Sequence, residues 1–415
     1  MKKVLSILLS VAMIVLCFAA CGKTDGDKSS TGKAANVKVG FIFLHDENST
    51  YDKNFITAAE EACKKAGVEI LKKTNISETQ ACYDAAAELV DEGCNVIFAD
   101  SFGHEPYVIQ AAKKFPEVQF LHATGTKAHT EGLSNYHNAF ASIYEGRYLA
   151  GVAAGMKLNE MISSGKITAD KAKMGYVGAY TYAEVISGYT SFYLGAKSVC
   201  PSVTMEVTFT GSWYDETAEK EAAQKLINNG CVLISQHADS MGAPTACEAA
   251  GVPNVSYNGS TVSACPNTFI VSSRIDWAPY LEYAIDCVKN GKAIDTDWTG
   301  TLSTGSVVLT DVNTKAAAEG TQAKIYEVKA ELESGKLHVF DTSAFTVTVS
   351  DSKNKNATVD ADGHLTGYKA DIDSDADNTG DTEVVSDGYF HESEKRSAPC
   401  FDVQIDGITL LDTKF

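Results

Sequence analysis

Residues 115–157 read FPEVQFLHATGTKAHTEGLSNYHNAFASIYEGRYLAGVAAGMK and hold two strong structural signals. Residues 118–123 are a short apolar run with β-branched and aromatic side chains, followed by the loop signal Thr124-Gly125-Thr126, which predicts a buried parallel strand. The second half predicts a helix whose small residues let other backbones approach closely: Gly146, Ala150, Gly151, Ala153, Ala154 and Gly155. We therefore expect this helix to be buried against other elements.

The same strand-and-helix alternation extends over most of the chain. Mostly apolar, strand-like runs occur at residues 37–44, 95–100, 118–123, 174–179, 204–209, 232–236, 254–257 and 268–272. Such runs without strict alternation are typical of parallel sheets that are covered on both faces, and amphipathic helical segments lie between them. The pattern predicts a doubly wound α/β architecture. Its strands are too many for one sheet, and the polar residues 159–173 divide it, so we expect two Rossmann-like lobes facing each other across a cleft.

The N-terminus has the layout of a bacterial lipoprotein signal. Lys2 and Lys3 precede an apolar run over residues 4–16, and small residues lead to Cys21. We interpret residues 1–21 as a signal peptide, with Cys21 as the lipidated residue, and the polar residues 22–36 as a flexible tether. An uncleaved anchor helix is the alternative, although the apolar run is shorter than the roughly 20 residues that a membrane span needs.

Composition limits the classes of partner. The formal charge of −19 argues against binding nucleic acid and against binding anionic lipid by charge. The sequence contains 11 cysteines, but none forms a CxxC pair, and we expect most of them to be small core residues. The histidines lack the spacing of metal ligands, so neither a metal nor another cofactor is expected.

In an open parallel sheet, ligands bind beside the carboxyl ends of the strands. The positions just after the predicted strand ends, and at the helix starts that follow them, are rich in aromatic, acidic, amide and hydroxyl groups. Our candidate ligand-binding residues are Asp46, Tyr51, Phe55, Ser101, Phe102, Tyr180, Glu184, Trp213, His237, Asp239, Asn258 and Arg274. Rings of this kind sandwich a flat ligand while polar groups bind its edge. The simpler alternatives are that Phe55 and Phe102 are core residues, that His237 and Asp239 form a local pair, and that Glu184 caps a helix or pairs with a lysine.

Several segments resemble one family, the basic membrane protein (BMP) family of substrate-binding lipoproteins of ABC importers, which includes receptors for purines and nucleosides. The segments are FPEVQFLHATG and YEGRYLAGVAAG in residues 115–157, and also YDKNFI (51–56), AYTYAEVI (179–186), GSWYD (211–215), QHADS (236–240) and YNG (257–259). The resemblance covers residues 37–340 and implies the type I periplasmic-binding-protein fold, with a hinged cleft.

The resemblance also implies roles for single residues. It places Phe55 where the family stacks a ring on the base, and Ile56 where the family has an asparagine. Asn258 stands where nucleoside receptors carry an aspartate for ribose, and Arg274 where they carry a ribose-binding lysine. These replacements favour a ligand that is recognised as a base, by its edge, rather than through a ribose.

We expect the following domain limits. The N-terminal lobe comprises residues 37–158 and 275–303, and the C-terminal lobe residues 159–274 and 304–340. Residues 341–396 are an acidic insertion, interpreted as a small β elaboration with loose loops, and residues 397–415 rejoin the second lobe.

Two classes of function fit these observations. The first is an extracytoplasmic binding protein, lipid-anchored to the cell membrane and monomeric, that captures a purine base or nucleoside and delivers it to an ABC permease. The second is an enzyme in the same cleft, such as a nucleoside hydrolase using Asp46 or Asp239, although no nucleophile elbow, phosphate loop or metal-ligand run is present in the sequence. A sugar-binding or sensory receptor of the same fold also remains open. We expect no catalytic residue.

Overall fold

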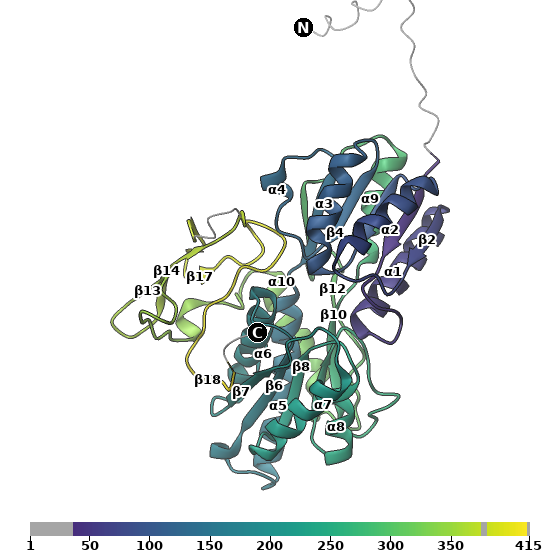
Figure 1. Cartoon of the computed structure of the whole chain (residues 1–415). Coiled ribbons are helices and arrows are strands. Elements are labelled where there is room, and N and C mark those ends of the chain that lie inside the picture. The colour runs from purple at the N-terminus through teal and green to yellow at the C-terminus, as the bar shows by residue number, and fades with distance from the viewer. Residues whose placement is uncertain (1–35, 375–379, 413–415) are drawn as a thin grey trace, which may run out of the picture. The chain divides into compact units, whose positions relative to one another are not determined.

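The structure is a computed structural model that describes residues 36–374 and 380–412, which belong to one compact unit (Figure 1). The expected signal peptide with Cys21, and the expected tether up to residue 35, lie outside the described residues. Among the helices that are described, none has the length and apolar character needed to cross a membrane.

The first sheet has six parallel strands in the order β11-β5-β4-β3-β1-β2. Their bounds are β1 Lys38–Ile42, β2 Glu69–Lys73, β3 Val96–Ala99, β4 Gln119–Ala123, β5 Tyr136–Ala141 and β11 Asp297–Gly300. Helices cover both faces: α1 (Thr50–Ala66) packs with α9 (Ala278–Lys289), and α2 (Gln80–Asp91) packs with α3 (Glu105–Lys114). Side chains alternate along β1, so that Phe41 and Phe43 join one core while Ile42 joins the other.

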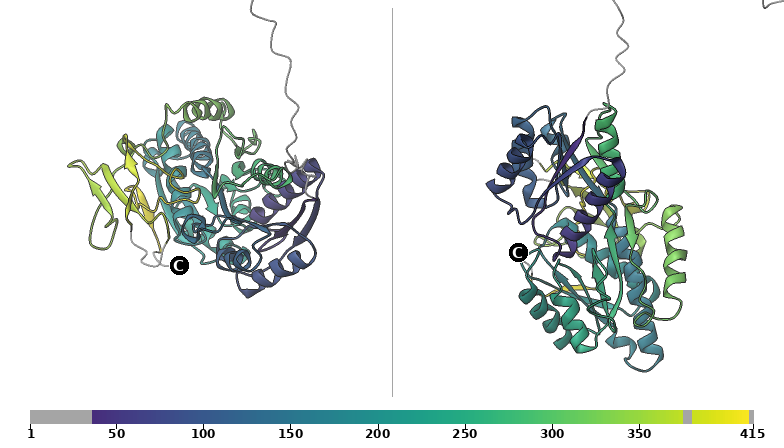
Figure 2. Two further views of the ribbon diagram at one scale, coloured as in Figure 1. Left: turned by 90° about the horizontal axis from the view of Figure 1, so that it is seen from above. Right: turned by 90° about the vertical axis from the view of Figure 1, so that its right-hand side faces the viewer.

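The second sheet has the order β12-β10-β9-β8-β6-β7-β18, parallel except that β12 runs antiparallel to β10. Its strands are β6 Lys173–Gly178, β7 Thr204–Phe209, β8 Leu233–His237, β9 Asn254–Tyr257, β10 Phe269–Ile275, β12 Val307–Leu309 and β18 Ile408–Leu410. The helices of this lobe are α5 Ile143–Ser163, α6 Ala183–Val199, α7 Glu216–Asn228, α8 Gly242–Ala250 and α10 Thr321–Glu333. Here α5 packs with α6 and α10, and α7 packs with α8, so each sheet has helices on both faces (Figure 2). The doubly wound α/β prediction is confirmed.

The small residues of α5 bring it close to α6. A Cβ atom added at Gly151 would lie 2.1 Å from the carbonyl oxygen of Phe192, and one at Gly195 would lie 2.0 Å from that of Tyr148. The buried helix expected from the sequence is therefore present. Its assignment to the first lobe, up to residue 158, is wrong, because all of α5 packs on α6, α10 and β10 of the second lobe. The polar break on which that limit rested marks the end of α5 and the loop before β6.

The chain passes between the two sheets three times, after β5, after β10 and between β11 and β12. At the first crossing, Ser142 N–H donates to the Gly300 carbonyl oxygen at 2.8 Å, which ties this connection to the end of β11. The crossings therefore lie at strand ends, where small changes of backbone angle can swing one lobe against the other.

The acidic segment after residue 340, which we interpreted as a small β elaboration with loose loops, contains short strands. It forms two small antiparallel sheets, with strands β13 Ala357–Val359, β14 Leu365–Ala370 and β15 Thr382–Glu383 in one, and β16 Val385–Ser386 and β17 Tyr389–Phe390 in the other. Apolar side chains from it are buried against residues 400–405, and Phe401 stacks on Phe340 with the ring centroids 4.1 Å apart. We call residues 341–412 the C-terminal extension.

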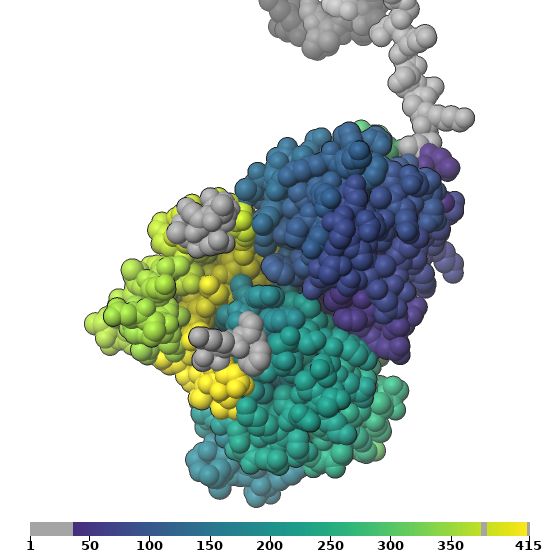
Figure 3. Space-filling view, in the orientation of Figure 1, coloured from purple at the N-terminus to yellow at the C-terminus, as the bar shows by residue number. Residues whose placement is uncertain are grey.

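The C-terminal extension contacts both lobes on one side of the molecule, where it is coloured yellow-green (Figures 1 and 3). In the first lobe, Thr130 Oγ1 donates to the Asp373 carbonyl oxygen at 2.6 Å, and Asp297 Oδ2 accepts from Ser397 N–H at 2.8 Å. In the second lobe, β18 adds a parallel strand beside β7. The extension therefore joins the outer strand of one sheet to the outer strand of the other.

The described residues also include nine cysteines, at positions 63, 82, 94, 200, 231, 247, 265, 287 and 400. All of them are buried, unpaired thiols, in agreement with their interpretation as small core residues.

Candidate functional site

The strand orders locate the site. In each sheet the order reverses beside the first strand of the lobe, between β1 and β3 and between β6 and β8, and the carboxyl ends of these strands face a common cleft. The central pocket there is lined by Leu44, Tyr51, Asp52, Ser101, Phe102, Thr124, Glu184, Trp213, His237, Asp239 and Tyr257. It therefore takes side chains from both lobes.

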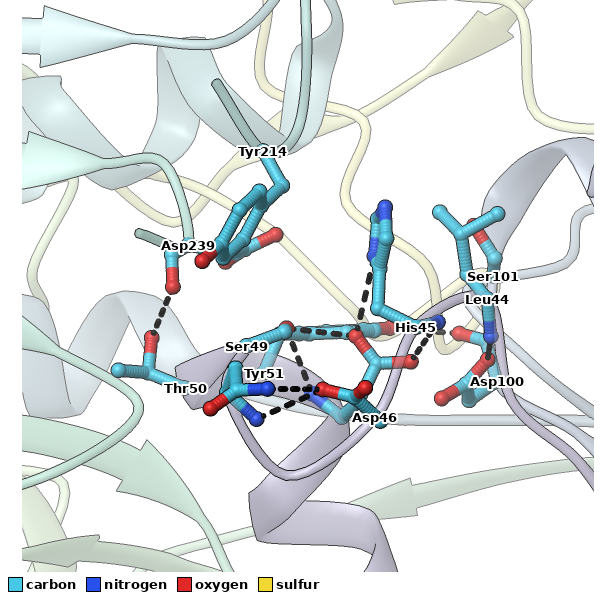
Figure 4. A network of polar contacts seen from close by, with 12 residues as sticks. Leu44, His45, Asp46, Ser49, Thr50, Tyr51, Asp100, Ser101, Tyr214 and Asp239 are labelled. Carbon is cyan, nitrogen blue, oxygen red and sulfur yellow. Dashed lines mark hydrogen bonds and ion pairs between the residues drawn. The ribbon is translucent and has the colours of Figure 1, made fainter. Parts of the chain in front are cut away.

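The first lobe supplies a buried pair of acids, Asp52 and Asp100, of which Figure 4 labels Asp100. Ser49 caps α1 by accepting from Asp52 N–H, and the Asp52 carboxylate accepts from His45 N–H at 2.8 Å and from Ser49 Oγ at 2.6 Å. Burial by itself raises the pKa of Asp52, but the hydrogen bonds from His45 and Ser49 outweigh burial and lower it. Asp52 is therefore held as a carboxylate at the edge of the pocket.

Asp100 is the second acid of this pair. Its Oδ1 accepts from Leu44 N–H at 3.1 Å, and its carbonyl oxygen accepts from Tyr51 Oη at 2.7 Å. Complete burial, with Asp52 close by, raises the pKa of Asp100 well above its usual range. The two acids are therefore shifted in opposite directions, Asp52 towards its charged form and Asp100 towards its neutral form.

The second lobe contributes His237 and Asp239 from the end of β8. His237 Nε2 lies 3.3 Å from Glu184 Oε1, and its ring lies 4.5 Å from that of Tyr257 between centroids. Burial lowers the pKa of His237, while the Glu184 carboxylate opposes this. Burial, helped by the nearby Glu219 carboxyl group, raises the pKa of Asp239 well above its usual value. Burial therefore favours the neutral form of both side chains of this wall.

The two walls touch in this structure. The Asp239 carbonyl oxygen accepts from Thr50 N–H at 3.0 Å and from Thr50 Oγ1 at 3.1 Å (Figure 4). The rings of His45 and Tyr214 also meet across the cleft, with centroids 5.4 Å apart. The central pocket encloses only about 20 Å³, room for about one water molecule. A flat bicyclic molecule can enter only if the lobes move apart.

Aromatic rings surround the mouth of the central pocket. Trp213 meets Tyr180 edge-on at 5.1 Å, and Tyr180 stacks on Tyr182 at 5.1 Å. Phe102 of the first lobe lies 5.3 Å from Tyr182 of the second, and both of these rings are exposed. Lobe separation would free these rings to accept a planar ligand between them.

A much larger side cavity of about 1430 Å³ opens from the central pocket, with which it shares Phe102, Thr124 and Glu184. Its first-lobe wall comes from α3 and from residues 124–131. Its outer wall comes from the C-terminal extension, through Ser374, Arg396, Ala398, Pro399, Asp402, Gln404 and Leu410. The extension thus borders the approach to the site on this side.

Seven of the residues chosen from the sequence line the central pocket: Tyr51, Ser101, Phe102, Glu184, Trp213, His237 and Asp239. Two others lie directly beside it. Tyr180 packs on Trp213, and buried Asn258 donates from Nδ2 to Asp239 Oδ1 at 3.3 Å. Asn258 has φ 64°, a conformation that asparagine tolerates better than most residues.

The structure places the remaining three elsewhere. Phe55 is buried in the core and stacks on Trp277 at 4.3 Å, so it does not face the cleft. Asp46 accepts from the backbone and side chain of Asn48 and shapes its own loop. Arg274 lies at the edge of the lobe interface, where it donates to Asn54 Oδ1 at 3.3 Å and pairs with Asp276 at 3.5 Å.

Sequence reasoning did not select Leu44, Asp52, Thr124 or Tyr257. Asp52 was detectable, because an acid three residues after Ser49 is typical of a capped helix start that carries buried polar groups. Tyr257 ends a fully buried strand and looks like an ordinary core residue. Among the described residues, no group of three or more His, Cys, Asp or Glu is arranged to hold a metal ion.

Comparisons with known proteins agree with this geometry. The family described as "ABC transporter substrate-binding protein PnrA-like" matches residues 41–336. A purine-binding protein of Brucella abortus is 31% identical over 73% of this chain and 83% of its own length. A putative ABC transporter glucose-binding protein of Haloferax volcanii is 27% identical over 78% of each chain, and a nucleoside-binding protein of Lactococcus lactis is 24% identical over 60% of this chain and 68% of its own.

Solved structures show the same fold. An ABC transporter solute-binding protein from Aeropyrum pernix superposes with a TM-score of 0.61 at 17% identity, covering 76% of this chain and 94% of its own. One from Conexibacter woesei gives a TM-score of 0.59 at 20% identity, covering 73% of this chain and 98% of its own. The two-lobed arrangement is the type I periplasmic-binding-protein fold.

Proposed function

This chain belongs to the family of PnrA-like ABC transporter substrate-binding proteins, and from this we propose that it captures a purine base or nucleoside outside the cytoplasm and delivers it to an ABC permease. The relatives named as purine- and nucleoside-binding support this ligand class. Lipidation of Cys21 would hold the protein beside its permease in the membrane.

The observation that carries the proposal is the composition of the central pocket. Exposed aromatic rings lie at its mouth, and carboxyl groups, a histidine and two tyrosines line its interior. Rings stack on a planar base, and carboxyl oxygens accept from its amino and ring N–H groups. None of the described residues that line it is a lysine or arginine. A nucleotide would therefore bring phosphate charges to a pocket that already carries carboxylates, and we expect it to be rejected.

Titration calorimetry with free bases, nucleosides, AMP and glucose tests the proposal. We expect binding of at least one purine base, with any nucleoside no tighter than its base, and no binding of AMP. Glucose is included because one relative is named as a putative glucose-binding protein and carboxylates also accept from sugar hydroxyl groups. Binding of glucose without any purine would replace the proposed ligand.

The membrane anchor is tested separately. A Cys21→Ser variant should leave the membrane fraction while binding its ligand with unchanged affinity. Full retention of this variant in membranes would contradict lipidation at Cys21.

A further inference from the structure

Arg147 is fully buried in the second lobe, in the second turn of the small-residue helix α5. Its Nη2 donates to Tyr176 Oη at 3.0 Å and to Ser235 Oγ at 2.9 Å, and its Nη1 donates to the Ser256 carbonyl oxygen at 3.3 Å. Among the described residues it has no carboxylate partner within ion-pair distance. A buried cation satisfied only by neutral groups is unfavourable unless negative charge nearby compensates it.

Three aromatic rings surround the guanidinium group. Its Cζ lies 5.3 Å from the Tyr176 ring, 5.1 Å from the Phe192 ring and 5.2 Å from the Tyr257 ring. The negative faces of aromatic rings attract a cation, especially in a desolvated position. These contacts hold the charge in place but do not neutralise it.

Tyr257 connects this cation to the ligand site. Its ring contacts Arg147 and also the ring of His237, and both Tyr257 and His237 line the central pocket. The site also places a carboxylate beside His237, because Glu184 Oε1 lies 3.3 Å from His237 Nε2. Arg147 thus lies one aromatic ring away from the acid-lined pocket, on the protein side.

We propose that Arg147 is the buried counter-charge of the acidic ligand site, a positioning residue that acts through Tyr257 and keeps His237 a neutral hydrogen-bonding group beside Glu184. The proposal rests on the proposed function, because it explains how an acid-lined pocket closes around an uncharged ligand. Without this cation, closure would bury the Glu184 carboxylate with no opposite charge behind it.

The groups that face His237 come from several elements. Glu184 lies on α6, Arg147 on α5, Tyr176 on β6 and Tyr257 on β9. Glu184 favours a protonated imidazole, whereas burial and the positive charge of Arg147 oppose it and lower the pKa of His237. A neutral His237 can donate one N–H towards Glu184 without adding charge to the pocket.

Nitrogen-detected NMR of the histidine rings tests this without any ligand. In the wild type we expect His237 to titrate below the ordinary histidine pKa of about 6.5. In Arg147→Met the pKa of His237 should rise towards that ordinary value, whereas in Arg147→Lys, which keeps a cation, it should stay closer to wild type. A wild-type His237 that titrates normally, or a folded Arg147→Met variant with unchanged titration, would overturn the proposal.

A double-mutant cycle keeps the proposal testable if Arg147→Met is poorly folded. Adding Glu184→Gln to Arg147→Met should recover part of the lost stability, because the uncompensated carboxylate is removed. If the effects of the two substitutions on stability are simply additive, Arg147 has only a packing role and the proposal is wrong. Failure to bind purines would overturn the proposed function and leave both of these readouts intact.

Discussion

The two lobes bury charges of opposite sign behind the same cleft. The first lobe holds Asp52 and Asp100, whose oxygens accept from backbone N–H groups and a serine hydroxyl group. The second lobe holds Arg147, which donates to hydroxyl groups and a carbonyl oxygen and is surrounded by rings. In each lobe, uncharged neighbouring groups hold a buried charged side chain in one orientation. The side chains behind the walls of the cleft are therefore oriented before any ligand binds.

The largest expected effect comes from disturbing the packing that holds Arg147 in the second lobe. Gly195→Val places a side chain where a Cβ atom would lie 2.0 Å from the Tyr148 carbonyl oxygen, so α5 must move away from α6 and carry Arg147 with it. We expect a loss of more than about 3 kcal/mol in the free energy of unfolding. Urea denaturation measures it. Gly259→Ala is the control, because its Cβ atom would meet nothing nearer than 3.8 Å, and an equal loss there would refute the packing argument.

The next prediction concerns the pH dependence of stability that comes from Glu219, a buried acid near Asp239. Glu219 is buried on α7 and accepts from Ser240 N–H at 3.2 Å, and burial raises its pKa to about 7 from the usual 4.5. The folded state therefore keeps a proton that the unfolded chain releases near pH 4.5. The stability that this contributes is complete below pH 4.5 and is lost as the pH rises through about 7.

The expected loss over this range is up to about 3 kcal/mol, from roughly 1.4 kcal/mol per pKa unit. Glu219→Gln should remove this part of the pH dependence, because glutamine stays neutral throughout. If the stability curves of the wild type and Glu219→Gln run parallel between about pH 4 and 8, the raised pKa is wrongly assigned to Glu219.

Within the first lobe, the two acids should respond unequally to the same change. Asp52→Asn replaces a carboxylate that accepts two hydrogen bonds, and we expect a loss of about 2 kcal/mol in stability at neutral pH. Asp100→Asn replaces an acid whose pKa burial raises by an amide that still accepts from Leu44 N–H, so we expect a loss of less than about 1 kcal/mol. Thermal denaturation of both variants measures the two losses. Equal losses would mean that the two acids do not differ in charge as their opposite pKa shifts indicate.

The smallest expected effect concerns the aromatic rings at the mouth of the central pocket, where neither buried charge acts directly. Trp213→Ala removes a ring from the mouth of the pocket, and we expect about a tenfold loss in ligand affinity with little loss of stability, since stacking contributes about 1 kcal/mol per ring beyond the apolar area that the ring buries. Calorimetry measures it, with Tyr326→Ala as the control because that ring is exposed on α10. Phe55→Ala should show the reverse, a large loss of stability, because Phe55 packs on Trp277.

The sequence predicted the architecture well where strands are apolar on both faces. The runs at residues 95–100 and 232–236 became β3 and β8, and the family resemblance is confirmed by the match over residues 41–336. The outer strand β2 was missed because Glu69–Lys73 is partly exposed and carries charged residues. An outer strand meets solvent along one side, so its sequence lacks the apolar run that signals a central one.

The site could be predicted only in part, for a physical reason. Position after a strand end identified Trp213, His237 and Asp239, because strand ends of one sheet gather in space. It failed for Phe55, because Phe55 lies in the second turn of α1, where a helix can point a ring into the core as easily as into the cleft. Arg147 gave no signal, because its partners Ser235 and Ser256 lie on strands far along the chain.

The strand β18 has a further consequence for the outer edge of the second sheet. Without Ile408–Leu410, β7 would end this sheet with an unpaired row of backbone N–H and C=O groups, a ready template for pairing with another molecule. The C-terminal extension replaces this six-residue edge by a strand of three residues, which leaves less backbone open to such pairing.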